Sequence, residues 1–519
     1  MQVHYLLENS AQKYPDKKAV WYKEEWRTYS EIDSLSNKLG GYLKEVGIKR
    51  GDRVVLLYEN SFNHIISYFA ILKAGGVCVA LNTETTVDFL IYLINNSDAK
   101  AIISNTQCSK YLLPSLKKTP YLKQVIIDQE DLNEYIKLGH INQISLNEIL
   151  KNGKETNLNV RSIDIDLEAI VYTSGSTGKP KGVMLTHLNT VSNMRSIVQY
   201  LHLTKDDRVM VVLPFYYIYG KSLLMTHFLV GGSVVIDNRF TYPNAVLKTM
   251  QKTEVTGFAG VPSTFMILLN KSSLNQYTFK SLRYITQAGG AMAPSVQKEV
   301  VKAFSPAKVY IMYGATEAAP RLSYVEPDML PKKWGSIGKP VPNVELYVAD
   351  NTGREVKAGE TGEIVARGSN IMAGYWRDPE GTKEVLKDGI YYTSDLGKVD
   401  KDGFLYVVGR KKDFIKVGGF KVSAKEIEER ILELDEVHET AVIGVNDTIL
   451  GEAVKAFIVA KEKININADT INKHLKGKLP PYEIPKYYEF RKILPKNESG
   501  KILKQKLIEE NRKRGENTI

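Results

Sequence analysis

The stretch Tyr172-Thr-Ser-Gly-Ser-Thr-Gly-Lys-Pro-Lys-Gly182 organises the interpretation of this chain. The apolar run Leu167-Glu-Ala-Ile-Val-Tyr172 before it is typical of a buried strand, and a helix is expected to begin in Val183-Met-Leu-Thr-His187. Three glycines, four small hydroxyl side chains and two lysines supply backbone N–H groups, hydroxyl donors and positive charge. The composition alone equally suits a surface turn. The alternative is a phosphate-binding loop, but not the Gly-x-x-x-x-Gly-Lys-Ser/Thr loop of common nucleotide hydrolases.

Length and composition indicate a globular protein of several units. The 519 residues exceed one ordinary core, and at roughly 150 residues per domain they predict three or four units. The chain is 43% hydrophobic and 25% charged, as soluble globular proteins are. Its two cysteines, Cys78 and Cys108, cannot form a disulfide framework, which favours a reducing compartment.

The sequence predicts neither a signal peptide nor an integral membrane segment. The acidic Glu8 comes before any long apolar region develops at the N-terminus. The longest apolar segment, residues 65–81, is interrupted by Lys73 and Gly75-Gly76 and is too short to span a bilayer. We therefore expect a cytoplasmic enzyme.

The net charge of +11 raises the question of a nucleic-acid partner. The lysines are spread along the chain and interleaved with acids, so a solvated surface is the favoured explanation of the positive charge. A phosphorylated substrate is a second reason for that charge. We predict no nucleic-acid partner and leave peripheral association with an anionic membrane open. The sequence sets no oligomeric state.

The order of patterns along the chain predicts an α/β fold with mostly parallel sheets. Strand patterns at 52–57, 77–81, 101–104, 124–127, 208–213, 232–236 and 282–286 are separated by helical patterns. Short strands and turns replace them in a small β-rich subdomain that begins at about residue 340. After residue 411 comes a small α+β domain, in which Ser423 and Glu426 predict a capping box. We therefore divide the chain into 1–411 and 412–519.

The whole set of motifs resembles the adenylate-forming superfamily, which contains acyl-CoA synthetases, adenylation domains and firefly-type luciferases. The resemblance begins with the loop at Tyr172 and continues through Tyr313-Gly-Ala-Thr-Glu317, similar to the family's Tyr-Gly-x-Thr-Glu motif. It extends to the segments 288–291, 392–397, 409–413, 415–422 and 494–501, in family order and spacing. It implies a large N-terminal part and a small C-terminal domain that reorients between two half-reactions.

The resemblance also implies roles for individual residues. Catalysis would rest on Lys501 bridging carboxylate and α-phosphate, Lys416 beside the thiol loop (Gly418 and Gly419), Thr316 on the α-phosphate and Glu317 on Mg²⁺. Lys412 would be the hinge. ATP or AMP would be bound by Thr173, Ser174, Gly175, Ser176, Thr177, Gly178, Lys179, Lys181, Gly289, Gly290, Tyr313, Gly314, Asp395 and Arg410.

One segment departs from the family pattern. In Pro214-Phe-Tyr-Tyr-Ile-Tyr-Gly220, Tyr217 falls where many acyl-CoA synthetases have histidine, which puts the usual acyl pocket in question. The segment also lacks the aspartate that commonly holds an α-ammonium group, so a standard α-amino acid is disfavoured. Tyr216, Tyr217 and Tyr219 are the predicted acid pocket, where they either stack on an aromatic acid or fill the core.

The resemblance implies an ATP-dependent carboxylic acid ligase. It would form an acyl-adenylate and pyrophosphate, with Mg²⁺, and then transfer the acyl group to a thiol, most simply that of CoA. The alternative acceptor is the phosphopantetheine of a separate carrier protein. A catalytically silent nucleotide-binding protein is the alternative from another class, and Lys501, Glu317 and Lys416 argue against it because a pure binder has no evident use for all three.

Overall fold

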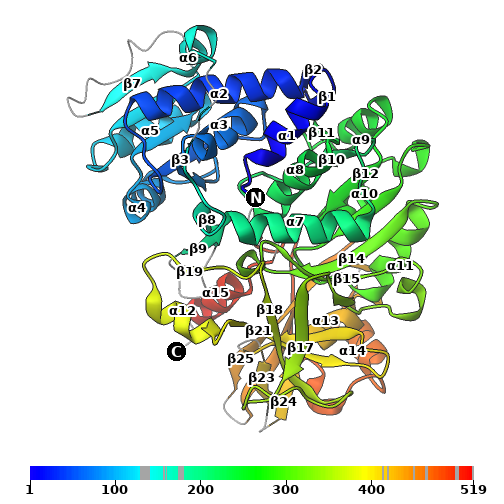
Figure 1. Ribbon diagram of the computed structural model, residues 1–519. Coiled ribbons are helices and arrows are strands. Elements are labelled where there is room, and N and C mark those ends of the chain that lie inside the picture. Colours follow the sequence, from blue (N-terminus) through cyan, green and yellow to red (C-terminus); the bar gives the residue numbers. More distant parts are fainter. Residues whose placement is uncertain are drawn as a thin grey trace.

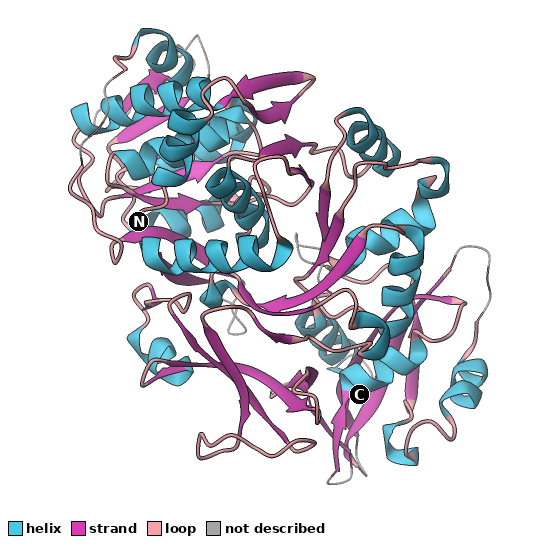
Figure 2. Ribbon diagram, turned by 45° about the vertical axis from the view of Figure 1, so that its right-hand side comes forward, coloured by secondary structure: helices cyan, strands magenta, loops and turns pink. Residues whose placement is uncertain are grey.

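Two large sheets and two smaller ones form the protein. The computed structural model describes residues 1–128, 141–155, 158, 160–173, 180–411, 414–417, 420–447, 450–461, 464, 466–496 and 502–516. Figure 1 follows the chain from the helix-rich N-terminal part to the C-terminal unit, and Figure 2 shows sheets alternating with helices.

The first large sheet has nine strands in the order β16-β15-β14-β13-β12-β10-β11-β1-β2. Its central pairings, from β1 through β11, β10, β12 and β13 to β14, are parallel, and its outer pairings are antiparallel. The strands are β1 Lys18–Tyr22, β2 Glu25–Thr28, β10 Arg208–Val211, β11 Ser233–Ile236, β12 Gly257–Gly260, β13 Tyr284–Gln287, β14 Lys308–Gly314, β15 Arg321–Val325 and β16 Lys339–Pro340.

The second large sheet has eight strands in the order β19-β9-β8-β4-β3-β5-β6-β7. It is parallel from β8 to β7, while β9 pairs antiparallel with both β8 and β19. The strands are β3 Arg53–Leu57, β4 Val77–Ala80, β5 Ala101–Ser104, β6 Gln124–Ile127, β7 Asn142–Ser145, β8 Leu167–Thr173, β9 Lys181–Thr186 and β19 Gly374–Tyr375.

Helices separate and cover these two sheets. They are α1 Tyr5–Lys13, α2 Tyr29–Glu45, α3 Phe62–Lys73, α4 Val87–Ser97, α5 Ser109–Leu116, α6 Leu146–Asn152, α7 His187–Leu201, α8 Ile218–Val230, α9 Pro243–Lys252, α10 Pro262–Lys271 and α11 Pro294–Ala303. Successive side chains of a strand point to opposite faces, so Val54 and Leu56 pack in a core with α2, α3, α7 and α8, whereas Val55 and Leu57 pack with α4 and α5. Met210 and Val235 of the first sheet pack on its other face with α9, α10 and α11. Burial on both faces explains the continuous apolar strands.

The β-rich subdomain and the C-terminal unit have separate sheets. The first contains β17 Val344–Ala349, β18 Thr361–Gly368, β20 Leu386–Lys387, β21 Ile390–Val399 and β22 Leu405–Arg410, with α12 Pro379–Val385 alongside. The second contains β23 Phe414–Val417, β24 Phe420–Ser423, β25 Val437–Asp447, β26 Gly451–Ala460 and β27 Tyr487–Phe490, with α13 Ala424–Ile431, α14 Ala468–Leu475 and α15 Lys504–Glu516. The Ser423 hydroxyl contacts both units, since it accepts a hydrogen bond from Glu426 N–H at the start of α13 and donates one to the Val408 carbonyl of β22.

The structure confirms the predicted fold class and places the expected helix start at His187, the last residue of the predicted stretch. Residues 183–186 do not begin a helix but belong to β9, which returns antiparallel along β8. The helix α7 begins at His187 because the side chains and backbone N–H groups of Thr186 and Asn189 form a reciprocal capping box. Apolar residues in so short a run fit strand and helix equally well, so the cap is the better local signal.

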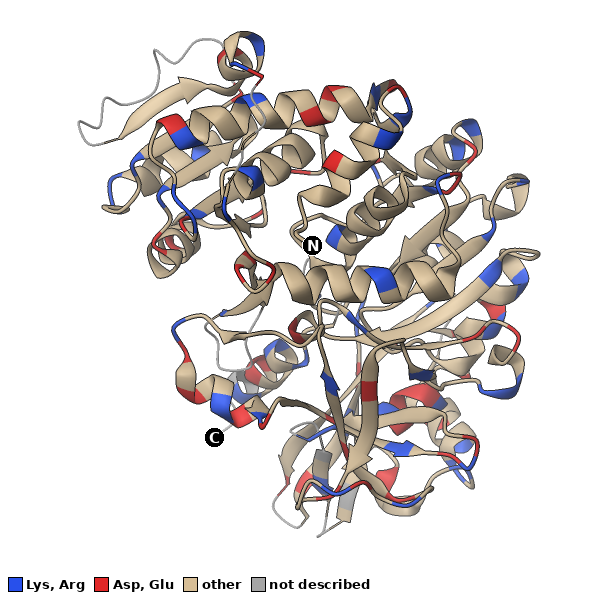
Figure 3. Cartoon of the chain, in the orientation of Figure 1, with Lys and Arg blue, Asp and Glu red and all other residues tan. Residues whose placement is uncertain are grey.

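The charged side chains are interspersed over the molecule. Figure 3 shows Lys and Arg positions alternating with Asp and Glu on the elements in view, as the sequence predicts for a solvated surface. None of the described helices is both long and apolar enough to cross a membrane.

Candidate active site

The predicted phosphate loop connects the two strands of an antiparallel hairpin. Thr173 ends β8 and pairs with Lys181 at the start of β9, where the Thr173 hydroxyl donates to the Lys181 carbonyl at 3.5 Å. The intervening site residues Ser174, Gly175, Ser176, Thr177, Gly178 and Lys179 lie outside the described residues. The hairpin therefore fixes both ends of the loop beside β19.

A chain of contacts joins this hairpin to the predicted metal ligand. The Lys181 ammonium nitrogen lies 3.4 Å from Asp378 Oδ2 and 4.7 Å from the centre of the Tyr375 ring. The Tyr375 hydroxyl donates to Glu317 Oε1 at 2.8 Å. Burial, together with the Glu317 charge, raises the pKa of Tyr375, so its hydroxyl remains a donor. Tyr375 thus contacts Lys181 through its ring and Glu317 through its hydroxyl.

Glu317 and Thr316 lie in a short 3₁₀ turn, Thr316–Ala318, directly after β14. The carboxyl ends of parallel strands are where open α/β sheets bind ligands. The turn folds back tightly, with Ala315 N–H donating to the Pro320 carbonyl at 2.9 Å. A Cβ at Gly314 would lie 1.9 Å from that carbonyl oxygen, so only glycine fits there. In the described part of the chain, the structure assigns Glu317 Oε2 no hydrogen-bond donor.

A second polar cluster centres on Asp395. The Tyr313 hydroxyl donates to Asp395 Oδ2 at 2.6 Å, and Arg410 Nε donates to Oδ1 at 2.9 Å. Arg410 lies directly across the ladder from Asp395 on β22. Burial, reinforced by the Asp395 charge, raises the pKa of Tyr313 far above its ordinary value and keeps it a donor. Each carboxylate oxygen has two acceptor sites, so Asp395 retains capacity for further donors such as a pair of hydroxyls.

The residue before Asp395 departs from the family motif but keeps the backbone conformation of glycine. Ser394 stands where the family has glycine, and its φ of 62° lies in the left-handed region that favours glycine. Its N–H donates to Glu363 Oε1 at 2.9 Å, and its carbonyl accepts from Lys411 N–H at 2.9 Å. These two hydrogen bonds hold serine in the glycine conformation.

The segment predicted to face adenine lies against a tyrosine of α8's N-terminus. Gly289 follows β13 with a φ of 85°, and a Cβ there would lie 3.0 Å from both the Tyr217 hydroxyl and Val261 Cγ1. Gln287 Nε2 donates to the Gly290 carbonyl at 2.9 Å and fixes the turn. Glycine therefore gives Tyr217 access to the backbone of this segment.

The three tyrosines of the predicted acid pocket differ in their surroundings. Tyr219 is 2% exposed, and its hydroxyl contacts the Thr286 carbonyl at 3.0 Å and the Thr286 hydroxyl at 2.8 Å. Tyr216 and Tyr217 are half-buried, and burial raises the pKa of Tyr217. Tyr219 thus fills the core, while Tyr217 lies between the core and the Gly289 segment.

The C-terminal unit carries the predicted thiol-side residues. Lys416 is exposed on β23, and its backbone N–H donates to Glu452 Oε2 at 2.7 Å. Within the described ranges, Lys416 forms no hydrogen bond or ion pair with Thr316, Glu317 or Asp395. The predicted residues Gly418, Gly419, Lys412 and Lys501 lie outside the described residues. Lys496 and Ile502 form a bridge across the segment that contains Lys501.

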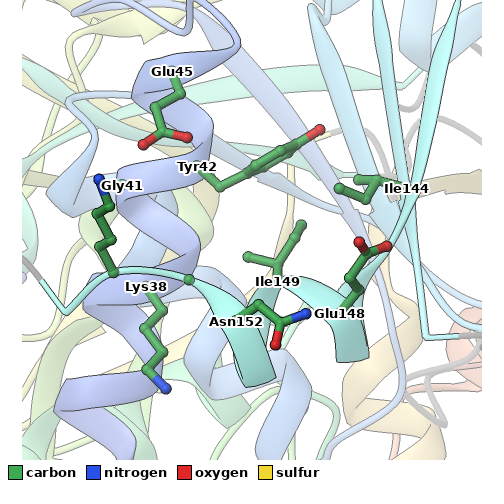
Figure 4. A pocket seen from close by; sticks show the side chains of 10 residues that line it. Lys38, Gly41, Tyr42, Glu45, Ile144, Glu148, Ile149 and Asn152 are labelled. Carbon is green, nitrogen blue, oxygen red and sulfur yellow. The ribbon is translucent and has the colours of Figure 1, made fainter.

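Sequence reasoning missed Tyr375, which contacts both Lys181 and Glu317, and Asp378, which pairs with Lys181. Neither has a local sequence signal, since Tyr375 lies 58 residues from its partner Glu317. A hollow of about 220 Å³ between α2 and α6, lined by residues that include Lys38, Tyr42 and Glu148, contains none of the predicted site residues (Figure 4).

Comparison with known proteins identifies the family. Residues 7–376 match the model of the AMP-binding enzyme family, and residues 426–501 match that of the AMP-binding enzyme C-terminal domain. The chain is 32% identical to a long-chain-fatty-acid–CoA ligase of Bacillus subtilis, over 97% of this chain and 94% of that protein.

Solved structures of similar proteins include the anthranilate CoA ligase AuaEII in complex with anthranoyl-AMP, with a TM-score of 0.89 and 26% identity over 98% of this chain and 96% of that chain. ATP-bound MatB from Rhodopseudomonas palustris has a TM-score of 0.88 and 29% identity over 99% of each chain.

Fold and site together define an acid-activating enzyme that forms AMP. The chain belongs to the AMP-binding enzyme family, within the adenylate-forming superfamily of acyl-CoA synthetase type. It is an acid–thiol ligase.

Proposed function

We propose that this chain uses ATP and Mg²⁺ to activate a carboxylic acid as its acyl-adenylate and then transfers the acyl group to CoA. The observation that carries the site assignment is the pair of clusters at the carboxyl end of β14, in which Tyr375 holds Glu317 and Tyr313 holds Asp395. The end of β14 thus supplies the Glu317 carboxylate, which suits a metal ion, and positions the Asp395 carboxylate, which suits the hydroxyls of a sugar. The ATP-bound and adenylate-bound relatives support this reading.

In the first half-reaction, a carboxylate oxygen of the acid attacks the α-phosphorus of ATP and pyrophosphate leaves. Lys501 is proposed to neutralise the two approaching anions, and the Thr316 hydroxyl to donate to the α-phosphate. Lys181 and the loop residues 174–179 bind the outer phosphates. Bound Mg²⁺ would offset the phosphate charge, and Glu317 is suited to hold it because its Oε1 is fixed by Tyr375.

The Asp395 cluster is proposed to bind the ribose. Arg410 and Tyr313 orient the carboxylate, and its remaining lone pairs accept the two ribose hydroxyls. The backbone of Gly289 and Gly290, which carries no side chains, then lies against adenine. These contacts bind the nucleotide without taking part in bond breaking, so they serve both half-reactions.

In the second half-reaction, the thiol sulfur attacks the acyl carbonyl carbon, the thiol proton is released and AMP leaves. We propose that Lys416 and the Gly418-Gly419 loop take part in this step, and that the C-terminal unit, 412–519, turns about Lys412 to bring them in. The change from one sheet to another between Arg410 and Phe414 supports a junction there. A hinge of a few residues can absorb such a rotation.

An ATP–pyrophosphate exchange assay over a panel of fatty, aryl and amino acids tests the first step. We expect Mg²⁺-dependent exchange with at least one class of carboxylic acid other than α-amino acids. Exchange with none, although ATP binds, would favour the catalytically silent alternative.

The acceptor is tested by adding either CoA or a phosphopantetheinylated carrier protein to the preformed adenylate. Thioester formation on CoA supports the proposal, and formation on the carrier protein alone would replace CoA with that acceptor. Enzyme without the acid is the control for hydrolysis of ATP.

A further inference from the structure

Arg321 is a buried arginine at the edge of the candidate active site. It begins β15, pairs across the ladder with Gly314 and is 2% exposed. Its backbone is held by Asn193, which donates to the Arg321 carbonyl at 2.8 Å and accepts from the Arg321 N–H at 2.9 Å. The backbone is therefore fixed only a few residues from Thr316 and Glu317.

The side chain of Arg321 lacks a counter-charge. Its Nε is buried without a hydrogen-bond partner, the side chain hydrogen-bonds to the neutral Tyr200, and no Asp or Glu forms an ion pair with it in the described part of the chain. A buried charge without a counter-charge costs several kcal/mol of folding free energy, so natural sequences seldom retain one without a use. An arginine here calls for an explanation beyond packing.

The surroundings of the guanidinium are aromatic. Its Cζ lies 4.8 Å from the centre of the Tyr219 ring, a cation–π contact that offsets part of the cost of burial. Burial raises the pKa of Tyr200 to about 12, while the nearby Arg321 charge opposes that rise. Burial likewise raises the pKa of Tyr217 against the same charge. One positive charge thus acts on tyrosines from α7 and α8.

This charge lies next to two of the tyrosines assigned to the acid pocket, Tyr217 and Tyr219. Tyr217 reaches the Gly289 segment, and Gly314 opposite Arg321 lies between Tyr313 and Thr316. Tyr219 is fixed in the core by Thr286, so its ring keeps a fixed place beside Arg321. The predicted acid pocket therefore has a positive group beside its aromatic residues.

We propose that Arg321 is a specificity-determining residue that binds a second carboxylate on the acid, so that the substrate is a short dicarboxylic acid activated at one end. This inference rests on the proposed function. A guanidinium presents parallel N–H donors that match a carboxylate in bidentate geometry. The second carboxylate supplies the counter-charge that the described residues do not provide, whereas a fatty acid would bury its alkyl chain against the guanidinium.

The activity test compares acids of equal carbon number that differ in the second carboxylate: butanoate with succinate, hexanoate with adipate and 4-methylbenzoate with terephthalate. We expect at least one diacid to exceed its monoacid partner in kcat/KM for pyrophosphate exchange. Arg321→Met, which keeps an unbranched side chain but no charge, should lower the diacid value by about 10²-fold or more and leave the monoacid value equal or higher. Arg321→Lys should retain part of the diacid preference. Monoacids preferred by the unaltered enzyme, or an equal loss for both acids in Arg321→Met, would overturn the inference.

A binding test separates this inference from the proposed reaction. In the presence of ATP, the diacid should raise the thermal midpoint of the unaltered protein more than its monoacid partner, and Arg321→Met should lose that difference while ATP alone still stabilises it. Arg208→Met is the matched control, because Arg208 is a partly buried arginine that stacks on Trp26. It lies at the start of β10, whereas the candidate site lies at the carboxyl ends of the strands. Arginine-dependent diacid binding without exchange for any acid would refute the ligase function and uphold the role of Arg321. Equal protection by both acids would refute that role.

Discussion

Replacing Lys221 with methionine should destabilise the protein, because it removes the counter-charge of a fully buried carboxylate. Lys221 on α8 and Glu168 on β8 lie 2.6 Å apart, with side chains 4% and 0% exposed. The Thr190 and Tyr68 hydroxyls also donate to Glu168. The pair therefore connects the strand that enters the phosphate loop with the helix that carries Tyr217 and Tyr219.

The expected loss is about 3–5 kcal/mol of unfolding free energy, the usual cost of breaking one side of a buried pair. Burial alone would raise the pKa of Glu168, but the Lys221 charge and the hydroxyl donors hold it below its ordinary value. That stability is fully present above the unfolded pKa and is lost as pH falls through the folded one. Without Lys221, burial should raise the folded pKa above the unfolded value, so the variant's deficit should grow as pH rises from 5 to 8.

Urea unfolding followed by circular dichroism at pH 5, 6, 7 and 8 measures this deficit, and hydrogen exchange shows whether β8 and α8 lose protection. The double variant Lys221→Met/Glu168→Gln is the matched control, because it removes both charges and its carboxamide keeps the shape of the carboxylate. It should recover about 2 kcal/mol relative to Lys221→Met. A single variant as stable as the unaltered protein at pH 8, or a double variant no better than the single one, would refute the reasoning.

Three further predictions concern the candidate site. Glu317→Gln should raise the half-saturating Mg²⁺ concentration of pyrophosphate exchange by about tenfold or more, since the amide keeps the shape but loses the charge that a hard cation needs; an unchanged Mg²⁺ titration would contradict the metal role. Ser394→Gly should raise the unfolding free energy by up to roughly 1 kcal/mol in calorimetry and Ser394→Val should lower it, because the φ of 62° is strained for side chains; the opposite order would argue against strain. Lys501→Ala should slow adenylate formation by roughly 10²–10³ and spare thioester formation from supplied adenylate, with the reverse for Lys416→Ala; stopped-flow assays of each half-reaction would detect an equal loss in both, which would contradict the division of roles.

The fold could be predicted from the sequence wherever apolar runs were bounded by turn residues. The strands near 53–57, 101–104 and 124–127 appear where they were expected. The hairpin of β1 and β2 was missed because Lys23 and Glu24 form its turn with φ of 49° and 69°, a conformation ordinarily marked by Asn or Gly. Sequence rules for such turns depend on residue type, and here the surrounding sheet determines the conformation.

The candidate site was predictable only in part. The motifs supplied Tyr313, Glu317, Asp395 and Arg410, and the structure brings Tyr313, Asp395 and Arg410 into direct contact. Tyr375 and Arg321 carry no local pattern, because their roles depend on contacts between elements far apart in sequence. A buried arginine cannot be distinguished from a surface arginine until the strands on either side of it are placed.

The peptide unit between Ser394 and Asp395 connects the proposed nucleotide site with the start of the C-terminal unit. The Ser394 carbonyl accepts a hydrogen bond from Lys411, and its neighbour Asp395 is paired with Arg410. The proposed ribose ligand and the last residue before the proposed pivot are therefore coupled through a single peptide unit. We expect the bound nucleotide to keep this peptide unit in place through both half-reactions, so that the turn of the C-terminal unit is confined to the residues after Lys411.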